Sequence, residues 1–192
     1  MKSTNMRSQI LDTAQDLIQK LGANAMSYAD ISEKVGIRKA SIHYYFPGKE
    51  DLIINVLDRY NDQFCQLFER ILASSEPATN KLNRYCNLFV ETLSDGEQDK
   101  ACLCGILGAE LNTLQPAVVN RISQFYQNNE IFIEKVLQSG IDSGEFSFVG
   151  NPRTMSKLIF SLLEGDLIIA RADRGVERIK ETIAQMMDLI QN

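Results

Sequence analysis

Apolar residues recur every three or four positions through almost the whole of this 192-residue chain. That spacing places them on one face of an α-helix, whereas a half-buried strand needs sustained alternation of apolar and polar residues, which the sequence lacks. The sequence therefore predicts an all-α fold. In the first helix the apolar face ends at Gly22, a residue suited to the left-handed conformation that follows a helix end. The apolar positions of that face are Ile10, Leu11, Ala14, Leu17, Ile18 and Leu21.

Two short helices are expected directly after this first helix. Ser27 followed by Asp30 resembles a capping box, which predicts a helix over about residues 28–35. Gly36 then provides a tight turn, and a second short helix over residues 38–46 must end before the next proline. Two short helices around a glycine turn are typical of a helix-turn-helix.

The rest of the chain is predicted to form one larger helical bundle. A long amphipathic helix begins after Gly48 and joins the two parts, and further breaks separate about five more helices. These breaks fall at residues 74–77, 94–99, 116, 139–152 and 173–175. We therefore divide the chain into a small domain, residues 1–49, and a larger domain, residues 50–192.

Positive charge is concentrated near the amino terminus. The net charge of −5 taken alone argues mildly against a nucleic-acid partner. Residues 1–50 nevertheless hold seven Lys or Arg against five Asp or Glu, a balance of +2. Four basic residues and no acidic one lie in the stretch that runs from Lys34 through Arg38 and Lys39 to Lys49. This stretch is the candidate surface for a polyanion.

Several functional classes find no support in the sequence. The chain has no run of about 18 apolar residues and no apolar signal stretch, so we expect a cytoplasmic protein without a membrane partner. The four cysteines follow no metal-ligand spacing, so we expect reduced thiols, no metal and no cofactor. We find no nucleophile with a base and no phosphate loop, which argues against an enzyme. The alternative left open is a helical small-molecule carrier or enzyme without DNA binding.

The second short helix carries the residue types that read DNA. In a helix-turn-helix this helix lies in the major groove, and its first residues touch base edges. Arg38 or Lys39 could reach guanine acceptors or a phosphate, and Ser41 is short enough for close approach. Lys49 begins the following helix, where it would add a second phosphate clamp. Side chains that can donate to phosphate oxygens follow at His43, Tyr44 and Tyr45, although core packing is the preferred interpretation for Tyr45 and Phe46.

The string ISEKVGIRKASIHYYFPGKEDL, residues 31–52, resembles the TetR family of regulators. The resemblance implies a three-helix DNA-binding domain over about residues 6–49, followed by an effector-binding and dimerisation domain. It implies a repressor that binds a near-palindromic operator in double-stranded DNA as a homodimer and is released by a small-molecule effector. It assigns base or phosphate contact to Ser27, Tyr28, Arg38, Lys39, Ser41, His43, Tyr44 and Lys49, with His43 standing where the family usually has Tyr.

The resemblance also implies that the last two helices pair with a second copy of the chain. Both helices carry more apolar residues than one small bundle needs, and a two-fold pairing would bury the surplus. These residues are Leu158, Ile159, Leu162, Leu163, Ile168 and Ile169 on the first of the two helices, and Val176, Ile179, Ile183, Met186, Met187 and Ile190 on the second.

The segment ACLCGILGAEL, residues 101–111, resembles the Gly-Cys-Leu segment of a TetR branch that includes the repressor of N-ethylmaleimide reductase. In that branch the cysteine senses electrophiles or oxidants, and Cys102 occupies the matching position. The competing interpretation of Cys102 is a small buried hydrophobe. If both residues lie on one helix, Cys104 points about 200° away from Cys102, which disfavours a disulfide.

A small apolar or aromatic effector is the other candidate ligand, because aromatic residues fall on helices that should surround the bundle interior. The predicted effector-binding residues are Phe64, Phe68, Tyr85, Phe89, Cys102, Phe125, Tyr126 and Asn129. Asn129, Glu164 and Arg171 lie at the margins and could orient a ligand, although contact with solvent or a second copy explains any one of them more simply.

Overall fold

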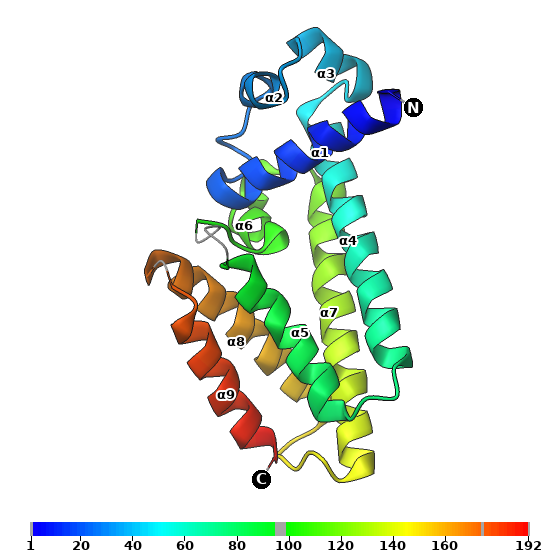
Figure 1. Cartoon of the computed structure of the whole chain (residues 1–192), viewed down its shortest axis with the longest axis vertical. Coiled ribbons are helices and arrows are strands. Elements are labelled where there is room, and N and C mark those ends of the chain that lie inside the picture. Colours follow the sequence, from blue (N-terminus) through cyan, green and yellow to red (C-terminus); the bar gives the residue numbers. More distant parts are fainter. Residues whose placement is uncertain (1, 95–98, 174, 192) are drawn as a thin grey trace. The chain divides into compact units, whose positions relative to one another are not determined.

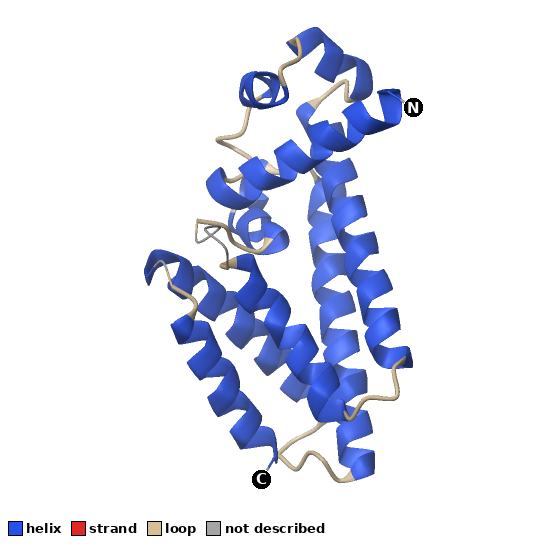
Figure 2. Ribbon diagram, in the orientation of Figure 1, coloured by secondary structure: helices blue, strands red, loops and turns tan. Residues whose placement is uncertain are grey.

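The computed structural model describes residues 2–94, 99–173 and 175–191 (Figure 1). Within these ranges every regular element is a helix, so the predicted all-α class is confirmed (Figure 2). None of the described helices is both long and apolar enough to span a bilayer. In chain order the elements are α1 (Lys2–Leu21), α2 (Tyr28–Val35), α3 (Lys39–Tyr45), α4 (Lys49–Ala73), α5 (Ala78–Thr92), α6 (Leu103–Ala109), the 3₁₀ turn η1 (Leu111–Thr113), α7 (Pro116–Ser143), α8 (Pro152–Asp173) and α9 (Glu177–Gln191).

The helix boundaries follow most of the predicted breaks. Residues 95–98 and 174, which belong to two of these breaks, lie outside the described residues. The predicted break over residues 139–152 begins too early, because α7 continues to Ser143 and ends at Gly144, whose φ is 78°. Gly140 is accommodated inside α7 because the ring of Phe146 fills the space that a Cβ at this position would need.

The helices form two compact units, which we describe separately. The first comprises residues 1–63 and 103–125. In it α1 packs against α2 and α6, and α2 packs against α3. The face of α1 predicted to be apolar is buried, except that Leu21 is 58% exposed. The centre of this core contains Ile10, Ala14, Ile18, Ile31, Ile42 and Phe46, all at most 1% exposed.

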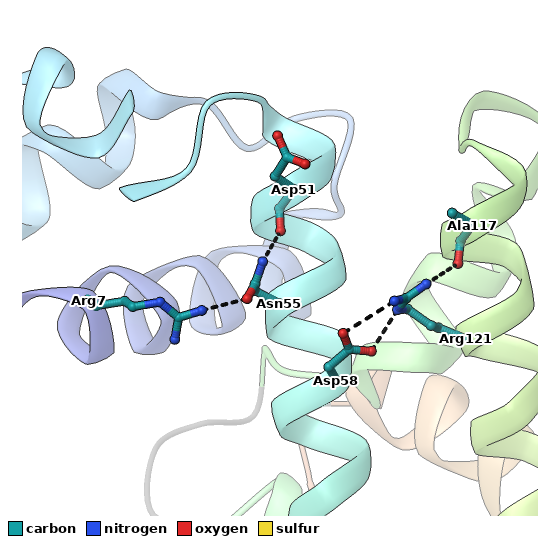
Figure 3. A network of polar contacts seen from close by, with 6 residues as sticks. All are labelled: Arg7, Asp51, Asn55, Asp58, Ala117 and Arg121. Atoms are coloured by element: carbon teal, nitrogen blue, oxygen red, sulfur yellow. Dashed lines mark hydrogen bonds and ion pairs between the residues drawn. The ribbon is translucent and has the colours of Figure 1, made fainter. Parts of the chain in front are cut away.

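Polar side chains join α1, α4 and α7 at the surface of the first unit (Figure 3). Arg7 of α1 donates to Asn55 Oδ1 at 2.5 Å, and Asn55 donates to the carbonyl of Asp51 at 2.7 Å. Arg121 of α7 pairs with Asp58 of α4, with 2.6 Å between Nε and Oδ1. Exposed pairs of this kind contribute about 0–1 kcal/mol each, so burial of the apolar core supplies most of the stability.

The second unit comprises residues 64–102 and 126–192. In it α8 and α9 run side by side, and α5 packs on both (Figure 1). The rings of Phe68 and Phe132 stack with 4.4 Å between their centroids, and the fully buried ring of Tyr85 lies 5.3 Å from Phe132. Arg178 of α9 donates to the buried Asp166 of α8 at 2.7 Å. Aromatic packing and an ion pair with a buried carboxylate therefore add to the stability that the buried apolar residues give this bundle.

Two long helices belong to both units. The chain passes from the first unit to the second within α4, after residue 63, and again within α7, after residue 125. The predicted domain boundary after residue 49 coincides with the first residue of α4. That boundary stays a prediction.

Glu145 supplies a helix cap that α5 cannot supply for itself, because the N-cap residue of α5 is Pro77 and makes no side-chain bond. The two carboxylate oxygens accept the amides of Ala78 at 3.0 Å and Thr79 at 2.9 Å. These hydrogen bonds lower the pKa of Glu145 from 4.5 to about 2. A carboxylate whose pKa falls on folding stabilises the fold above pH 4.5 and loses that effect as the pH falls toward 2.

Replacing Glu145 by alanine is expected to lower the free energy of unfolding by about 1 kcal/mol at neutral pH, as for other lost N-caps. The deficit relative to the wild type should shrink as the pH falls from 4.5 toward 2, because the carboxylate of the unfolded wild-type chain becomes protonated and this favours unfolding. Urea unfolding at neutral and acidic pH measures both effects. Glu91→Ala, at an exposed position of α5, is the control. A deficit that is equal at both pH values would contradict this role.

Candidate nucleic-acid interface and effector site

The two short helices adopt the predicted local structure. Ser27 Oγ accepts the amides of Ala29 and Asp30, and Asp30 accepts the amide of Ser27 at 2.8 Å, so the predicted capping box is confirmed. The Ser27 hydroxyl, which donates to Asp30 Oδ2 at 2.7 Å, and then the Ser27 amide lower the pKa of Asp30. Gly36 has φ 73° and ends α2 in the left-handed conformation. The second short helix is shorter than predicted, because Arg38 is its extended N-cap residue and Phe46 its C-cap residue.

The cationic residues at the start of α3 are available to a ligand. Arg38 and Lys39 are exposed, and in the described part of the chain neither side chain forms a hydrogen bond or an ion pair. Tyr44, farther along the same helix, is 83% exposed, and Ser41 is half-buried. These four residues form the surface that we call the α3 face. Two unpaired cations beside an exposed tyrosine suit a polyanion such as DNA.

Other predicted contact residues already form hydrogen bonds within their own domain. The hydroxyl of Tyr28 lies 2.9 Å from the carbonyl of Phe46 and 2.6 Å from that of Gly48. Burial, followed by the charge of Asp51, raises the pKa of Tyr28 to about 12. His43 Nδ1 lies 3.2 Å from the carbonyl of Pro47, and the Tyr28 and His43 rings are 4.8 Å apart. Both side chains therefore fix the turn that follows α3. The Ser27 hydroxyl, which belongs to the capping box, is also engaged.

Replacing Tyr28 by phenylalanine is expected to lower the free energy of unfolding by about 1–2 kcal/mol, because buried carbonyls lose their donor. All four side chains of the α3 face are kept, so affinity for DNA should fall less than when Arg38 is replaced. Urea denaturation and DNA titration of the same preparation measure the two quantities. A variant with unchanged stability but abolished DNA binding would show that Tyr28 contacts DNA directly.

The other two basic residues of the predicted surface have partners. Lys34 Nζ lies 3.2 Å from Asp16 Oδ2, so its charge is offset within the domain. Lys49 Nζ lies 3.4 Å from the carbonyl of Asn24. Asp16 lies on α1, outside the basic stretch in sequence but beside it in the fold. The net charge around α3 is therefore smaller than the four positive charges that the sequence suggests.

Glu110, which the sequence did not single out, holds the loop between α1 and α2. Its Oε2 accepts the amide of Ala23 at 2.8 Å, and both of its oxygens lie 3.3 Å from the amide of Asn24. The amide side chain of Asn24 in turn donates to Thr113 Oγ1 at 2.9 Å. The segment after α6 is therefore bonded to the loop that leads into the helix-turn-helix.

Gly22 makes room for that carboxylate. Its φ of 89° is one that side chains disfavour, and a Cβ there would lie 2.5 Å from Glu110 Oε1. The predicted left-handed end of α1 is confirmed, and the close approach of Glu110 adds a second reason for glycine.

The predicted effector residues are divided between the two units. Phe125 belongs to the first unit, where its ring lies 5.3 Å from that of Tyr60. The others lie in the second unit, where the rings of Phe68, Tyr85 and Phe89 are in contact and Tyr85 donates to Asn129 Oδ1 at 2.9 Å. Phe64 contacts Phe68, Tyr126 contacts Phe160 and Cys102 is buried. Phe125 thus lies in a different unit from the rest of the predicted set.

Cys102 precedes α6 instead of lying on it, so the helical angle expected between Cys102 and Cys104 does not apply. Cys102 is 6% exposed, Cys86 and Cys104 are fully buried, and all four cysteines are free thiols. Burial raises the pKa of the Cys86 thiol to about 12. Cys86 is therefore a packing residue, whereas Cys102 lies beside another titratable group.

That group is Glu164 of α8, for which contact with solvent or a second copy was the simpler expectation. Both carboxylate oxygens are shielded from solvent, and neither accepts a well-formed hydrogen bond in the described part of the chain. Burial raises the pKa of Glu164 to about 7, and the neighbouring Cys102 thiol, a weak donor, opposes the rise. The expectation for Glu164 as a solvent contact is therefore wrong. Arg171, for which contact with solvent or a second copy was also the simpler expectation, is half-buried.

The predicted pairing helices differ in what they expose. On α9 the predicted residues from Ile179 to Ile190 are buried within the unit. On α8, Leu158, Leu162, Ile168 and Ile169 are 38–61% exposed, and Leu189 of α9 is 66% exposed. Leu158, Leu162 and Leu189 also line a groove of about 620 Å³ between α8 and α9. Exposed apolar side chains of this number are unusual for a surface that stays in water.

Comparison with known proteins agrees with this architecture. The family described as "Bacterial regulatory proteins, tetR family" matches residues 10–56, and "Tetracyclin repressor-like, C-terminal domain" matches residues 78–186. The chain is similar to the HTH-type transcriptional repressor NemR of Escherichia coli, with 22% identity over 96% of this chain and 93% of NemR.

The solved structures agree on the fold. A TetR-family regulator from Agrobacterium tumefaciens superposes with a TM-score of 0.92 at 27% identity, covering 98% of this chain and 99% of that one. Reduced E. coli NemR superposes with a TM-score of 0.85 at 19% identity, covering 97% of each chain. With the second family match alone spanning more than half of its residues, the chain belongs to the TetR family of bacterial transcriptional regulators, which are DNA-binding proteins and not enzymes.

Proposed function

We propose that this regulator is a repressor that binds a near-palindromic operator as a homodimer and leaves it when a small molecule occupies the second unit. The observation that carries the proposal is the α3 face, where Arg38 and Lys39 are exposed and unpaired among the described residues. A capping box, the left-handed Gly36 and the bonds of Tyr28 hold that face in a fixed shape. A rigid cationic helix fits the major groove without an ordering cost.

The exposed apolar residues of α8 support pairing with a second copy. Leu158 and Leu162 lie one helical turn apart on the rim of the groove between α8 and α9, and Leu189 lies on its α9 side. A second chain that places the same residues against this surface would bury all of them around a two-fold axis. Such a dimer would present two α3 faces about one DNA turn, roughly 34 Å, apart.

Continuity of the chain offers a route from effector to DNA. Cys102, which lies beside Glu164 in the second unit, is followed directly by Leu103, the first residue of α6. The segment after α6 carries Glu110, whose carboxylate holds the loop before α2. An effector that displaces Cys102 would shift α6 and strain the Glu110 bonds. Release requires that the effector bind this shifted state more tightly than the DNA-bound one.

The proposal is tested by mixing the purified protein with fragmented DNA of its source and sequencing the fragments that are retained. We expect enrichment of a short inverted repeat whose half-sites lie about one helical turn apart, with protection of both half-sites in a footprint. Affinity should fall steeply as the salt concentration rises, because phosphate contacts release counterions. Retention of fragments without a shared sequence would overturn the assignment as an operator-binding repressor.

Two kinds of effector remain candidates, a reactive electrophile that alkylates Cys102 and a reversible apolar ligand. Replacing Cys102 by serine is expected to leave release by a reversible ligand within about threefold of wild type, while release by N-ethylmaleimide would be abolished if this thiol is the sensor. Gel-shift titration of wild type, Cys102→Ser and Cys65→Ser against N-ethylmaleimide distinguishes the two. We favour the reversible ligand, because Cys102 is 6% exposed and lies against a carboxylate, whose charge would repel a thiolate.

A further inference from the structure

The most unusual group in the second unit is the carboxylate of Glu164. Its two oxygens are both shielded from solvent, and no lysine or arginine of the described residues pairs with either of them. By contrast Asp166, two residues later on α8, is also buried but is paired with Arg178. Shielded carboxylates are normally paired, because an uncompensated buried charge is costly. Glu164 is therefore short of a cationic or hydrogen-bond-donating partner.

The polar groups around Glu164 do not supply that partner. Tyr85 of α5 carries a hydroxyl that is electrostatically coupled to Glu164, but this hydroxyl donates to Asn129 Oδ1 at 2.9 Å instead. Burial and then the negative charge of Glu164 raise the pKa of Tyr85 well above its ordinary value. The two groups therefore interact electrostatically but do not form a hydrogen bond with each other. The Cys102 thiol lies beside the carboxylate but is a weak donor. Among the described residues, the oxygens of Glu164 therefore accept no strong hydrogen bond.

Aromatic side chains lie near this acceptor. Phe160 lies one turn before Glu164 on α8, and its ring is 5.7 Å from that of Tyr126. Tyr85, which interacts with Glu164, is in ring contact with Phe68, Phe89 and Phe132. Aromatic faces attract cations and also pack well against apolar groups. A lone carboxylate among such rings has the chemistry that recognises an organic cation.

We propose that Glu164 is the recognition group of the effector site and that it selects effectors with a protonated amine on an aromatic or apolar body. The ammonium group donates to the Glu164 oxygens, and the body of the ligand packs on the rings of the Tyr85 cluster. Glu164 with a pKa of about 7 gains its full charge when the cation arrives, because the opposite charge favours the ionised form. This inference rests on the proposed function only for its consequence, the release of DNA.

The test uses three probes that share one ring and differ in charge, namely phenethylamine, phenethyl alcohol and phenylpropionate. Calorimetry with the full-length protein at neutral pH is expected to show that the amine binds about tenfold or more tightly than the alcohol, as for hydrogen bonds to charged groups. The carboxylate probe should bind most weakly because Glu164 repels it. In Glu164→Gln, which keeps the shape and removes the charge, the amine should lose about 30-fold or more in affinity and the alcohol little.

Asp173→Asn is the matched control, because it removes an exposed carboxylate from the same helix. It should keep the preference for the amine, and circular dichroism should show that both variants are folded. An amine that binds no better than the alcohol, or fails to bind at all, overturns the inference, as does an amine affinity that Glu164→Gln leaves unchanged.

Titration of the wild-type protein with its selected DNA separates this inference from the proposed function. If the DNA binds and the amine preference is absent, the inference about Glu164 fails while the repressor stands. If no DNA is retained but the amine preference depends on Glu164, the proposed function fails while the site stands. If both hold, phenethylamine should release DNA from the wild type but not from Glu164→Gln.

Discussion

Replacing Arg38 and Lys39 together by alanine is expected to weaken binding to the selected operator about a hundredfold or more. A base-contacting arginine contributes about 1–3 kcal/mol, and a dimer loses two copies of it. The slope of log affinity against log salt should also become shallower, by about 0.9 for each phosphate that the protein no longer neutralises. Fluorescence anisotropy with a labelled operator, measured at several salt concentrations, gives both quantities.

The matched control removes two positive charges elsewhere. Arg153 and Lys157 are exposed residues of α8 in the second unit, so Arg153→Ala with Lys157→Ala lowers the net charge equally without touching the α3 face. This control should retain operator affinity within about threefold, since scattered distant charges act only through screened long-range attraction. Equal losses in the two double variants would mean that general charge, and not α3, drives binding.

Replacing Leu158 and Leu162 together by glutamate is expected to convert the proposed homodimer to a monomer. Each side chain is at least 38% exposed in the isolated chain, so the monomer tolerates the change. In the dimer each glutamate would be buried without a partner, which costs about 3–5 kcal/mol and weakens self-association roughly a thousandfold or more. Light scattering after size-exclusion chromatography measures the mass, and operator affinity should collapse in parallel because half-sites are then bound singly.

Val149→Glu controls for the added charge. Val149 is 97% exposed in the loop between α7 and α8, outside the groove, so this variant should remain a dimer. If the Leu158→Glu, Leu162→Glu protein stayed folded and dimeric, the dimer interface would have to lie on another surface of the chain.

Local signals allowed the sequence to predict the helix-turn-helix closely. The capping box of Ser27 and Asp30, the turn at Gly36 and the start of α4 at Lys49 all depend on neighbours within four residues. Dihedral preferences and hydrogen bonds at that range are visible in a sequence. The break predicted over residues 139–152 begins too early, because α7 continues through Gly140, against which the ring of Phe146 packs, to Ser143.

Features that depend on tertiary contact were not predictable from residue types. Lys34 belongs to the cationic stretch in sequence, but Asp16 of α1 offsets its charge in the fold. Tyr28 and His43 resemble donors to DNA, yet both lie against carbonyls of the turn that ends at Gly48. Glu164 looks like a surface acid on an amphipathic helix, yet in the fold both of its oxygens are shielded, and Tyr85 of α5 and Cys102 interact with it.

The fit between Gly22 and Glu110 has an evolutionary consequence. Because a Cβ at position 22 would lie 2.5 Å from Glu110 Oε1, a side chain there would displace the carboxylate from its bonds, so we expect the two positions to vary together. Among descendants of a common ancestor, lineages that replaced the glycine should also have shortened the acid, and lineages that kept the acid should have kept the glycine. The two positions are 88 residues apart in the sequence. Correlated substitution at these positions would show which relatives keep the hydrogen bonds between the segment after α6 and the loop that leads into the helix-turn-helix.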